Sequence, residues 1–369
     1  MTLRVLVKRE RLLLALIILF IILCFVDPSF PRRTPSLLDA GSLSLIISLL
    51  AVSRGVELSG ILDRLVFKLL RVAGGSPARL CILLLLLTAG LSSLIMNDTA
   101  MFIFTPLALL VSKQTGVSRD LLVALTAIAA NVGSSLTPIG NPQNIIIWQR
   151  YKLGFHEFVA GIAPYVLVWL IILLIISWAG CSRVEKARVQ AMPVVRVNKM
   201  LAVSSTILIL ANILLGQLGH PIIGLAVTIA VLLAVGRQAL RALDIALVAI
   251  FALMFMDFGE ITLLLENKSI ITRIATTTPP ILMLTTLLLS QAISNVPATI
   301  LVTTTTTPQN WLPLTLGVNL GGTGTIIGSL ANIIAIRIAT TNTRTFMKYT
   351  IPYMTITTVI TTLILIIKQ

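Results

Sequence analysis

Apolar stretches recur along this chain from Leu12 to Ile367, and their lengths approach or exceed what is needed to cross a bilayer. A membrane-spanning helix needs about 20 mostly apolar residues. Only 11% of the residues are charged, whereas soluble domains carry about 25%. A chain with so few charges cannot cover a surface that faces water, so a soluble enzyme is excluded. We therefore expect an all-α polytopic membrane protein that is not an enzyme.

About nine full crossings are expected. Seven of them are plain apolar runs, and two are interrupted near their middles by glycines, the first of these by prolines as well. The nine are Leu12–Val26, Leu37–Val52, Leu121–Trp148, Phe155–Trp178, Met200–Leu218, Pro221–Val235, Leu243–Met256, Leu314–Ile336 and Tyr349–Ile367.

Two further apolar stretches, residues 80–111 and 279–307, are interrupted midway by polar residues, at Asn97-Asp98-Thr99 and at Ser294-Asn295. Each stretch is either two crossings or one re-entrant hairpin that enters and leaves on the same side. The arm from Pro297 to Thr307 is too short to span a bilayer. We therefore favour a hairpin at 279–307 and, by analogy, at 80–111.

The 28 lysine and arginine residues outnumber the 13 acidic residues and give a net charge of +15. In a soluble protein this excess would suggest nucleic acid, but in a membrane protein it is typical of the positive-inside bias of short loops. With the N-terminus inside, seven cations fall outside and the other 21 inside. The seven are Arg32, Arg33, Arg150, Lys152, Lys268, Arg273 and Lys368. We expect a multi-pass cytoplasmic membrane protein with its N-terminus inside and no nucleic-acid partner.

The two halves of the chain resemble each other. Residues 131–146 align without gaps on 319–334 with eight of sixteen positions identical, and 91–100 align on 289–298 with five of ten. The single crossing Met200–Leu218 joins the halves and inverts the second relative to the first. Inverted repeats with interrupted helices point to a secondary transporter. The sequence therefore predicts an inverted-topology repeat with two re-entrant hairpins and two unwound transmembrane helices.

This repeat divides the chain into three parts. The first repeat, 1–180, holds two helices, an interfacial helix at Val56–Val72, the hairpin 80–111, the broken helix 121–149 and the helix 155–178. An inside loop and connecting helix follow at 181–220. The inverted second repeat, 221–369, holds the hairpin 279–307 and the broken helix 314–336. Phe258–Ile274 matches Val56–Val72 in position, and each is either an interfacial amphipathic helix or a solvated loop.

The aligned segments 131–144 and 319–332 are where helices are expected to unwind, because glycine frees the backbone and proline removes a donor. Unwinding exposes carbonyl groups, which coordinate cations, and creates helix N-termini, which attract anions. Neutral amide and hydroxyl groups add donors and acceptors at a depth where charges are costly. The predicted site for substrate and ion comprises Asn97, Asp98, Thr99, Asn131, Gly133, Thr137, Gly140, Asn141, Asn144, Ser294, Asn295, Asn319, Gly321, Thr325, Gly328, Ser329 and Asn332.

Asp98 is the one acid in the repeated motifs, and its counterpart is Val296. An acid at membrane depth indicates function by default, so Asp98 carries a proton, binds Na⁺, or caps the hairpin tip through backbone amides. Asp257 and Glu260 lie close to a membrane end and are expected to be interfacial. The run Thr303–Thr307 either lines a polar path or reflects the threonine and isoleucine bias of this half.

At these motifs the sequence resembles the ArsB/NhaD permeases of the ion-transporter superfamily, which also contains citrate-type transporters. The resemblance is carried by Met-Asn-Asp-Thr-Ala at 96–100, by residues 131–144, by Ser-Asn-Val-Pro-Ala at 294–298 and by Gly-Ser-Leu-Ala-Asn at 328–332. Residues 131–144 are especially similar to the YbiR-like anion permeases. The resemblance implies that the two hairpin tips meet the two unwound helices around substrate and Na⁺. The Na⁺ site would include Asn97, Asn295 and nearby backbone carbonyls, and no other cofactor is implied.

These features together predict a secondary permease for a small anion, coupled to Na⁺ or H⁺ and working by alternating access. Three alternatives stay open: a Na⁺/H⁺ antiporter in which Asp98 titrates, an arsenite-type efflux permease, and a partner subunit that transports nothing. The sequence does not choose among arsenite, citrate, dicarboxylates, sulfate and silicate as the substrate. It also leaves a homodimer open.

Overall fold

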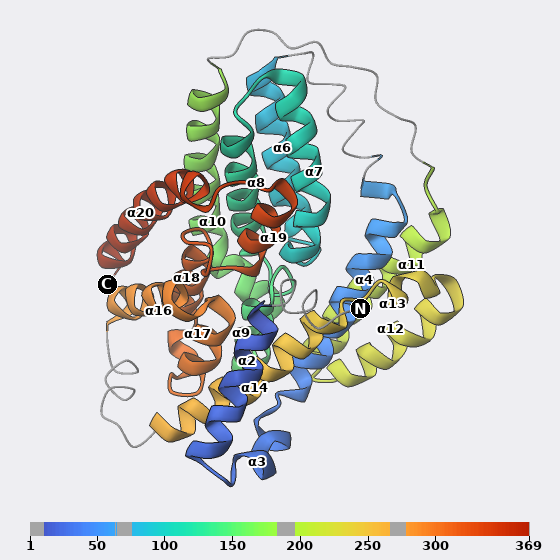
Figure 1. Ribbon diagram of the computed structural model, residues 1–369, viewed down its shortest axis with the longest axis vertical. Helices are drawn as coiled ribbons and strands as arrows, with labels where there is room; N and C mark the ends of the chain where they lie inside the picture. Colours follow the sequence, from blue (N-terminus) through green and yellow to red (C-terminus); the bar gives the residue numbers. More distant parts are fainter. Residues whose placement is uncertain (1–10, 63, 65–75, 183–195, 266–277, 369) are drawn as a thin grey trace.

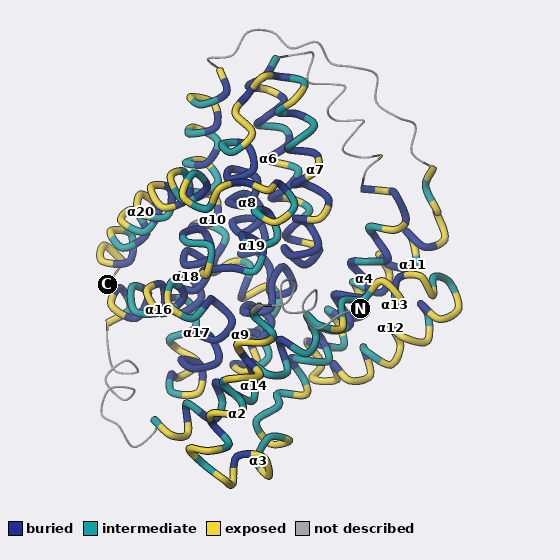
Figure 2. The backbone as a smooth tube through the Cα atoms, viewed as in Figure 1, coloured by how far each residue is buried: buried dark blue, intermediate teal, exposed yellow. Residues whose placement is uncertain are grey.

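The computed structural model describes residues 11–62, 64, 76–182, 196–265 and 278–368, and these residues form helices and connections with no strand among them. Buried residues gather around the middle of the bundle, and exposed residues follow its outer faces (Figure 2). Many of the exposed side chains are large and apolar, among them Phe25, Ile175, Leu210, Ile222 and Leu363. An outer surface of this kind fits lipid and does not fit water.

Five described helices are long and apolar enough to cross a membrane. They are α4 (Ala40–Leu58), α10 (Phe155–Cys181), α11 (Lys199–Gln217), α14 (Ile245–Leu265) and α20 (Thr343–Ile367). Several shorter apolar helices accompany them, including α2 (Arg11–Val26) and α12 (Pro221–Val235). Each expected crossing coincides with a helix or a helix pair, while the total of about nine crossings stays a prediction.

Two of the expected crossings are broken. In the first, α8 (Arg119–Ser134) ends and α9 (Pro142–Tyr151) begins after an unwound stretch; in the second, α18 (Trp311–Gly321) is followed by α19 (Leu330–Ala339). Proline suits the first position of α9 because that position has no helical partner for an N–H. The residues before α9 and α19, Asn141 and Ser329, each accept a backbone N–H with their side chains. The local sequence therefore accounts for where α9 and α19 begin after the unwound stretches.

The two hairpins are also present. Their arms are α6 (Pro77–Ser92) with α7 (Asn97–Thr115), and α16 (Pro279–Ile293) with α17 (Asn295–Thr303). Each tip docks on a helix break: Asn97 N–H donates to the Gly140 carbonyl at 2.9 Å, and Asn295 N–H donates to the Gly328 carbonyl at 3.2 Å. The predicted fold class is therefore confirmed, whereas the residue limits of the two repeats stay predictions.

Equivalent helices of the two repeats make the same packing contacts. Helix α6 packs on α8 as α16 packs on α18, and α9 contacts α17 as α19 contacts α7 (Figure 1). Lys152 and Thr340, which the alignment makes equivalent, both adopt left-handed backbone, with φ of 51° and 50°, at the C-terminal ends of α9 and α19. Each second half-helix therefore lies against the hairpin of the other repeat, so the halves interlock.

The remaining helices lie around this centre. Helices α4, α11 and α12 pack together at the right of Figure 1, next to the short α13 (Arg237–Arg241). The short α3 (Phe30–Leu37) packs against α14, and a 3₁₀ turn, η1 (Pro308–Asn310), precedes α18.

Two expectations need correction or fall outside the described chain. Most of the predicted interfacial helix Val56–Val72 lies outside the described residues, and α4 itself runs on to Leu58. Phe258 does not begin a separate surface helix, because α14 continues unbroken to Leu265. The acids Asp257 and Glu260 on this helix are fully buried within the protein, so neither side chain faces lipid or water; their position near a membrane end stays a prediction.

We predict that Gly133→Ala destabilises the protein by about 1–3 kcal/mol, the usual range for overpacking. A Cβ at Gly133 would overlap the backbone of Ala89 in α6, which cannot shift as a side-chain end can. Thermal unfolding of the purified protein in detergent measures the effect. Gly90→Ala is the matched control, since nothing lies within 4 Å of its Cβ. An unchanged melting temperature for Gly133→Ala would contradict the close packing of α8 on α6.

Candidate substrate and ion site

Four helix N-termini converge where the hairpin tips meet the broken helices. They belong to α7 and α17 from the hairpins, and to α9 and α19 from the second halves of the broken helices. Helix N-termini carry partial positive charge and unpaired N–H groups, so they attract anions. The same place holds the C-terminal ends of α8 and α18, whose carbonyl groups suit a cation.

Four asparagines join the two halves of the chain in a reciprocal pattern. Asn131 Nδ2 donates to Asn332 Oδ1 at 3.0 Å, and Asn319 Nδ2 donates to Asn144 Oδ1 at 2.7 Å. The alignment makes Asn131 equivalent to Asn319 and Asn144 equivalent to Asn332, so these are the same contact made twice. All four side chains are buried. Buried amides must be hydrogen-bonded, and here each half satisfies the other.

Asn144 also holds the first break in shape. Its Nδ2 lies 3.2, 3.2 and 3.0 Å from the carbonyl oxygens of Ser134, Ser135 and Thr137. Ser134 is the last residue of α8, and Ser135 and Thr137 belong to the unwound stretch that follows it. Three carbonyl oxygens therefore surround one point, the arrangement that a hard cation such as Na⁺ also requires of its ligands.

Asn332 does the same at the second break. Its Nδ2 donates to the carbonyls of Gly322 and Thr325, both at 2.9 Å. The helix-starting residues join the network as well: Ser329 Oγ donates to Asn131 Oδ1 at 3.0 Å, and Asn141 Nδ2 donates to Asn319 Oδ1 at 3.0 Å. These two contacts are again equivalent under the alignment.

The first hairpin tip meets this network through the side chain of Asn97. Asn97 Nδ2 donates to Asn131 Oδ1 at 3.1 Å, and Asn97 Oδ1 accepts the backbone N–H of Asp98 at 2.9 Å. The second tip turns at Ser294, whose φ of 77° is rare for a residue with a side chain. Such backbone strain collects at ligand-binding sites, where the surroundings hold it in place. Whether Asn97 and Asn295 bind Na⁺ stays a prediction.

The four predicted glycines, Gly133, Gly140, Gly321 and Gly328, allow neighbouring backbone segments to pack closely. A Cβ at Gly133 or Gly321 would overlap the first hairpin arm of its own repeat, at Ala89 or Ser290. A Cβ at Gly140 or Gly328 would overlap the carbonyl end of the preceding half-helix. Glycine is therefore required here by space, and these residues position the site.

Asp98 and Thr99 lie beside the network and do not take part in it. They line a small cavity with Arg54 of α4 and with Asp244. Asp98 is buried, and among the described residues no hydrogen bond joins its carboxyl group to an amide side chain or to a backbone N–H. The structure therefore gives no support to a capping role at the hairpin tip.

Two amides, the buried Gln143 and the partly buried Gln291, were missed by the sequence analysis. Gln143 Nε2 lies 3.4 Å from Asn319 Oδ1, and Gln291 Nε2 donates to the Gly321 carbonyl at 2.6 Å while its Oε1 accepts from Thr325 N–H at 2.8 Å. Gln143 lies inside the aligned segment opposite Ala331, and Gln291 lies opposite Ser93, so identity between repeats could not find them.

An ion cluster away from the network was missed as well. Arg33 donates to Glu260 Oε1 at 2.6 Å and also pairs with the carboxylate of Asp27. Hydrogen bonds from the hydroxyl and N–H of Ser29, together with Arg33, hold the pKa of Asp27 at about 2. The two acids in turn raise the pKa of Arg33. Glu260 is fully buried because this cation reaches it from α3, a contact between residues 227 positions apart.

Comparison with known proteins agrees with the motifs. Residues 4–314 match the family described as citrate transporter. The inner membrane protein YbiR of Escherichia coli is 32% identical over 330 residues, which cover 89% of this chain and 88% of that protein. The transporter MJ0456 of Methanocaldococcus jannaschii, described as uncharacterized, is 30% identical over 77% of this chain and 76% of its own length.

A solved structure shares the fold. The crystal structure of the YdaH transporter of Alcanivorax borkumensis superposes with a TM-score of 0.57, covering 92% of this chain and 87% of that chain at 16% sequence identity. At this identity the likeness concerns the fold alone.

We predict that Asn144→Ala and Asn332→Ala each destabilise the protein by about 1–3 kcal/mol, because each leaves buried carbonyl groups without a donor. The two losses should be similar, since the residues occupy equivalent places. Thermal unfolding in detergent measures both, with the exposed Gln238→Ala as control. A loss confined to one of the two asparagines would contradict their equivalence.

We also predict that Arg33→Gln lowers the unfolding temperature of the protein, because it leaves Glu260 buried without a counter-charge. Its neighbour Arg32→Gln is the control, as Arg32 is exposed. Equal unfolding temperatures for the two variants would show that the Arg33–Glu260 pair contributes nothing.

Proposed function

The chain belongs to the citrate transporter family, and from this premise we propose that it is a secondary transporter that moves a small anion by coupling it to Na⁺ or H⁺. As a multi-pass membrane transporter it has a small-molecule substrate. What this proposal adds is the charge of the substrate, the coupling ion and the residues that bind them. The N-terminus is proposed to lie inside.

One observation carries the proposal: four helix N-termini point into one buried cluster of neutral amides. An anion gains from the partial positive charge of each helix and from amide N–H donors, and it meets no fixed negative charge in this cluster. Neutral amides also lower the free-energy cost of the empty site at membrane depth, where a permanent cation such as arginine would be strongly destabilising.

The amide pairs also explain how binding could drive movement. Asn131–Asn332 and Asn319–Asn144 join the two halves across the break. An anion that takes their donors replaces neutral hydrogen bonds with charge-assisted ones, which are roughly twice as strong. Binding thus releases one half from the other at little net cost. Alternating access needs such an exchange.

The coupling ion has two candidate positions. The carbonyls around Asn144 form an oxygen-rich place for Na⁺ at the first break, where the tip residue Asn97 also docks; Asn295 docks on the second break, at Gly328. Asp98 is the alternative, because its buried carboxyl group lies one residue from Asn97 and makes no hydrogen bond with a described residue. A proton or Na⁺ on Asp98 would remove its charge from the membrane interior.

Two measurements on the purified full chain test the proposal. Thermal shift with citrate, succinate, sulfate, arsenite and silicate, each with and without Na⁺, selects the anion. Uptake of that anion into proteoliposomes under an imposed Na⁺ or H⁺ gradient then tests coupled transport. Cation-dependent proton movement with no anion requirement would replace this function with a Na⁺/H⁺ antiporter. The absence of any flux would leave a protein that transports nothing.

We predict that Asp98→Asn abolishes the dependence of uptake on the coupling ion while the fold stays intact, because the neutral amide cannot titrate and has no charge to be balanced by a proton or Na⁺. Uptake is measured at several pH values and Na⁺ concentrations, and thermal unfolding checks the fold. Asp120→Asn, at the partly exposed start of α8, is the control. Unchanged coupling in Asp98→Asn would move the ion to the carbonyl position.

A further inference from the structure

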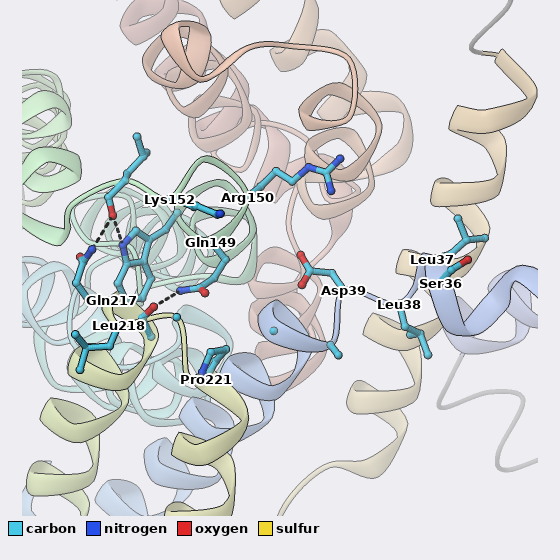
Figure 3. A pocket seen from close by; sticks show the side chains of 16 residues that line it. Ser36, Leu37, Leu38, Asp39, Gln149, Arg150, Lys152, Gln217, Leu218 and Pro221 are labelled. Carbon is cyan, nitrogen blue, oxygen red and sulfur yellow. Dashed lines mark hydrogen bonds between the residues drawn. The ribbon is translucent and has the colours of Figure 1, made fainter.

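A cavity of about 730 Å³ opens at one end of the bundle, far along α9 from the amide network (Figure 3). Its wall comes from the connection between α3 and α4, the last turn of α9 and the connection between α11 and α12. The charged residues in this wall are Arg150, Lys152 and Asp39. None of the motifs from the sequence analysis lies here.

The two cations of this cavity have no ion-pair partner among the described residues, whose ion pairs are those of Arg33 and Arg54. Both side chains are exposed. Asp39 offsets one of the two charges but forms no ion pair with either cation; its two carboxylate oxygens accept hydrogen bonds from Ser42 N–H at 2.9 Å and Ser42 Oγ–H at 2.8 Å. The cavity therefore presents a net positive wall with free guanidinium and ammonium donors.

The neutral groups of the wall are fixed in place. Gln149 Nε2 donates to the Gly216 carbonyl at 3.2 Å, and Gln217 is tied to both Leu153 and Phe155 through its amide. The dashed lines of Figure 3 show the bonds of Gln149 with Gly216 and of Gln217 with Leu153, while Arg150 makes no bond there. The wall is thus preformed, and the cations alone are left to bind a ligand.

Arg150 also lines a second cavity, of about 280 Å³, which shares Ser36, Leu37 and Asp39 with the first. The second cavity runs beside α9 to Ile146, two residues from Asn144, and along Thr303–Thr305 of the second hairpin arm. Tyr151 Oη lies 2.5 Å from Thr306 Oγ1, so α9 and this arm are joined at the same end. Arg150 therefore lies at the junction of the two cavities, the second of which extends along α9 toward the amide network.

The charge pattern singles out these cations. In the predicted topology this end is outside, where lysine and arginine are scarce. Of the other described outside cations, Arg33 pairs with Asp27 and Glu260, Arg32 lies on the exposed face of α3, and Lys368 lies over the ring of Tyr165. At the opposite end, Thr340 holds the place of Lys152 and is bound by Arg119. The free pair at 150 and 152 has no equivalent in the other repeat.

We propose that Arg150 and Lys152 form an entry site that binds a small soluble oxyanion, such as a carboxylate or sulfate, before it passes along α9 to the amide network. This proposal deepens the proposed function and rests on the substrate being an anion. A cleft lined by one sign of charge concentrates counter-ions and speeds their capture. Guanidinium binds planar oxyanions with two parallel N–H groups.

Cysteine modification tests the entry site without any transport assay. Ser36→Cys places a thiol at the junction of the two cavities, and only Cys24 is replaced by alanine, since Cys81 and Cys181 are fully buried. Rates are compared for an anionic sulfonatoethyl and a cationic trimethylammonioethyl methanethiosulfonate reagent in lipid-free micelles. We expect the anionic reagent to react faster and Arg150→Gln to lower the rate ratio several-fold. Sulfate and citrate should slow the reaction more than chloride at equal ionic strength.

Controls separate this site from its alternatives. Lys152→Gln should lower the ratio as well, and it replaces Arg150→Gln if that variant unfolds; Arg344→Gln, exposed in the first turn of α20, should leave the ratio unchanged. A ratio that does not respond to either cavity variant overturns the proposal. Protection by added phosphatidylglycerol but not by sulfate or citrate also overturns it, because the cations then hold a lipid headgroup. Anion protection without any measurable uptake would keep the entry site and refute the proposed function instead.

Discussion

The structure depends on the need to satisfy buried amides at membrane depth. Asn131, Asn144, Asn319 and Asn332 lie where water cannot serve as a partner, so each must find its donors and acceptors in the protein. They find them across the repeat boundary and at the broken ends of α8 and α18. The same contacts hold the breaks open, tie the two halves together and gather four helix N-termini around one place.

Much of this could be predicted from the sequence because the same site residues occur in both repeats. Identities such as Asn131/Asn319 and Asn144/Asn332 marked the paired asparagines, and glycine with proline marked the breaks. Contacts that occur in only one half of the chain could not be predicted in this way. Gln143 and Gln291 have no matching residue in the other half, and Glu260 is buried by Arg33 across 227 positions. From the sequence alone, an acid near a helix end such as Glu260 is expected at the membrane interface, because the sequence does not reveal that Arg33 lies against it.

The asymmetric residues are those most directly concerned with charge. Asp98 stands opposite Val296 and lies beside the amide network, next to Arg54. Arg150 and Lys152 line one end of α9, while Thr340 holds the place of Lys152 at the end of α19. A symmetric scaffold can place hairpins and breaks, but directional coupling requires differences between its two faces. Neutral amides therefore supply the shared frame, and under the proposed function the few charged residues are what distinguishes its two faces.

A double-mutant cycle on the reciprocal amide pairs tests the central claim most directly. Coupling energies are measured by thermal unfolding for Asn131 with Asn332 and for Asn319 with Asn144, using alanine at each position. Contacting residues in a shared network show interaction energies of about 0.5–3 kcal/mol. Two favourable coupling energies of similar size are expected, because the contacts are equivalent. Coupling near zero in either pair would contradict the reciprocal tie between the halves.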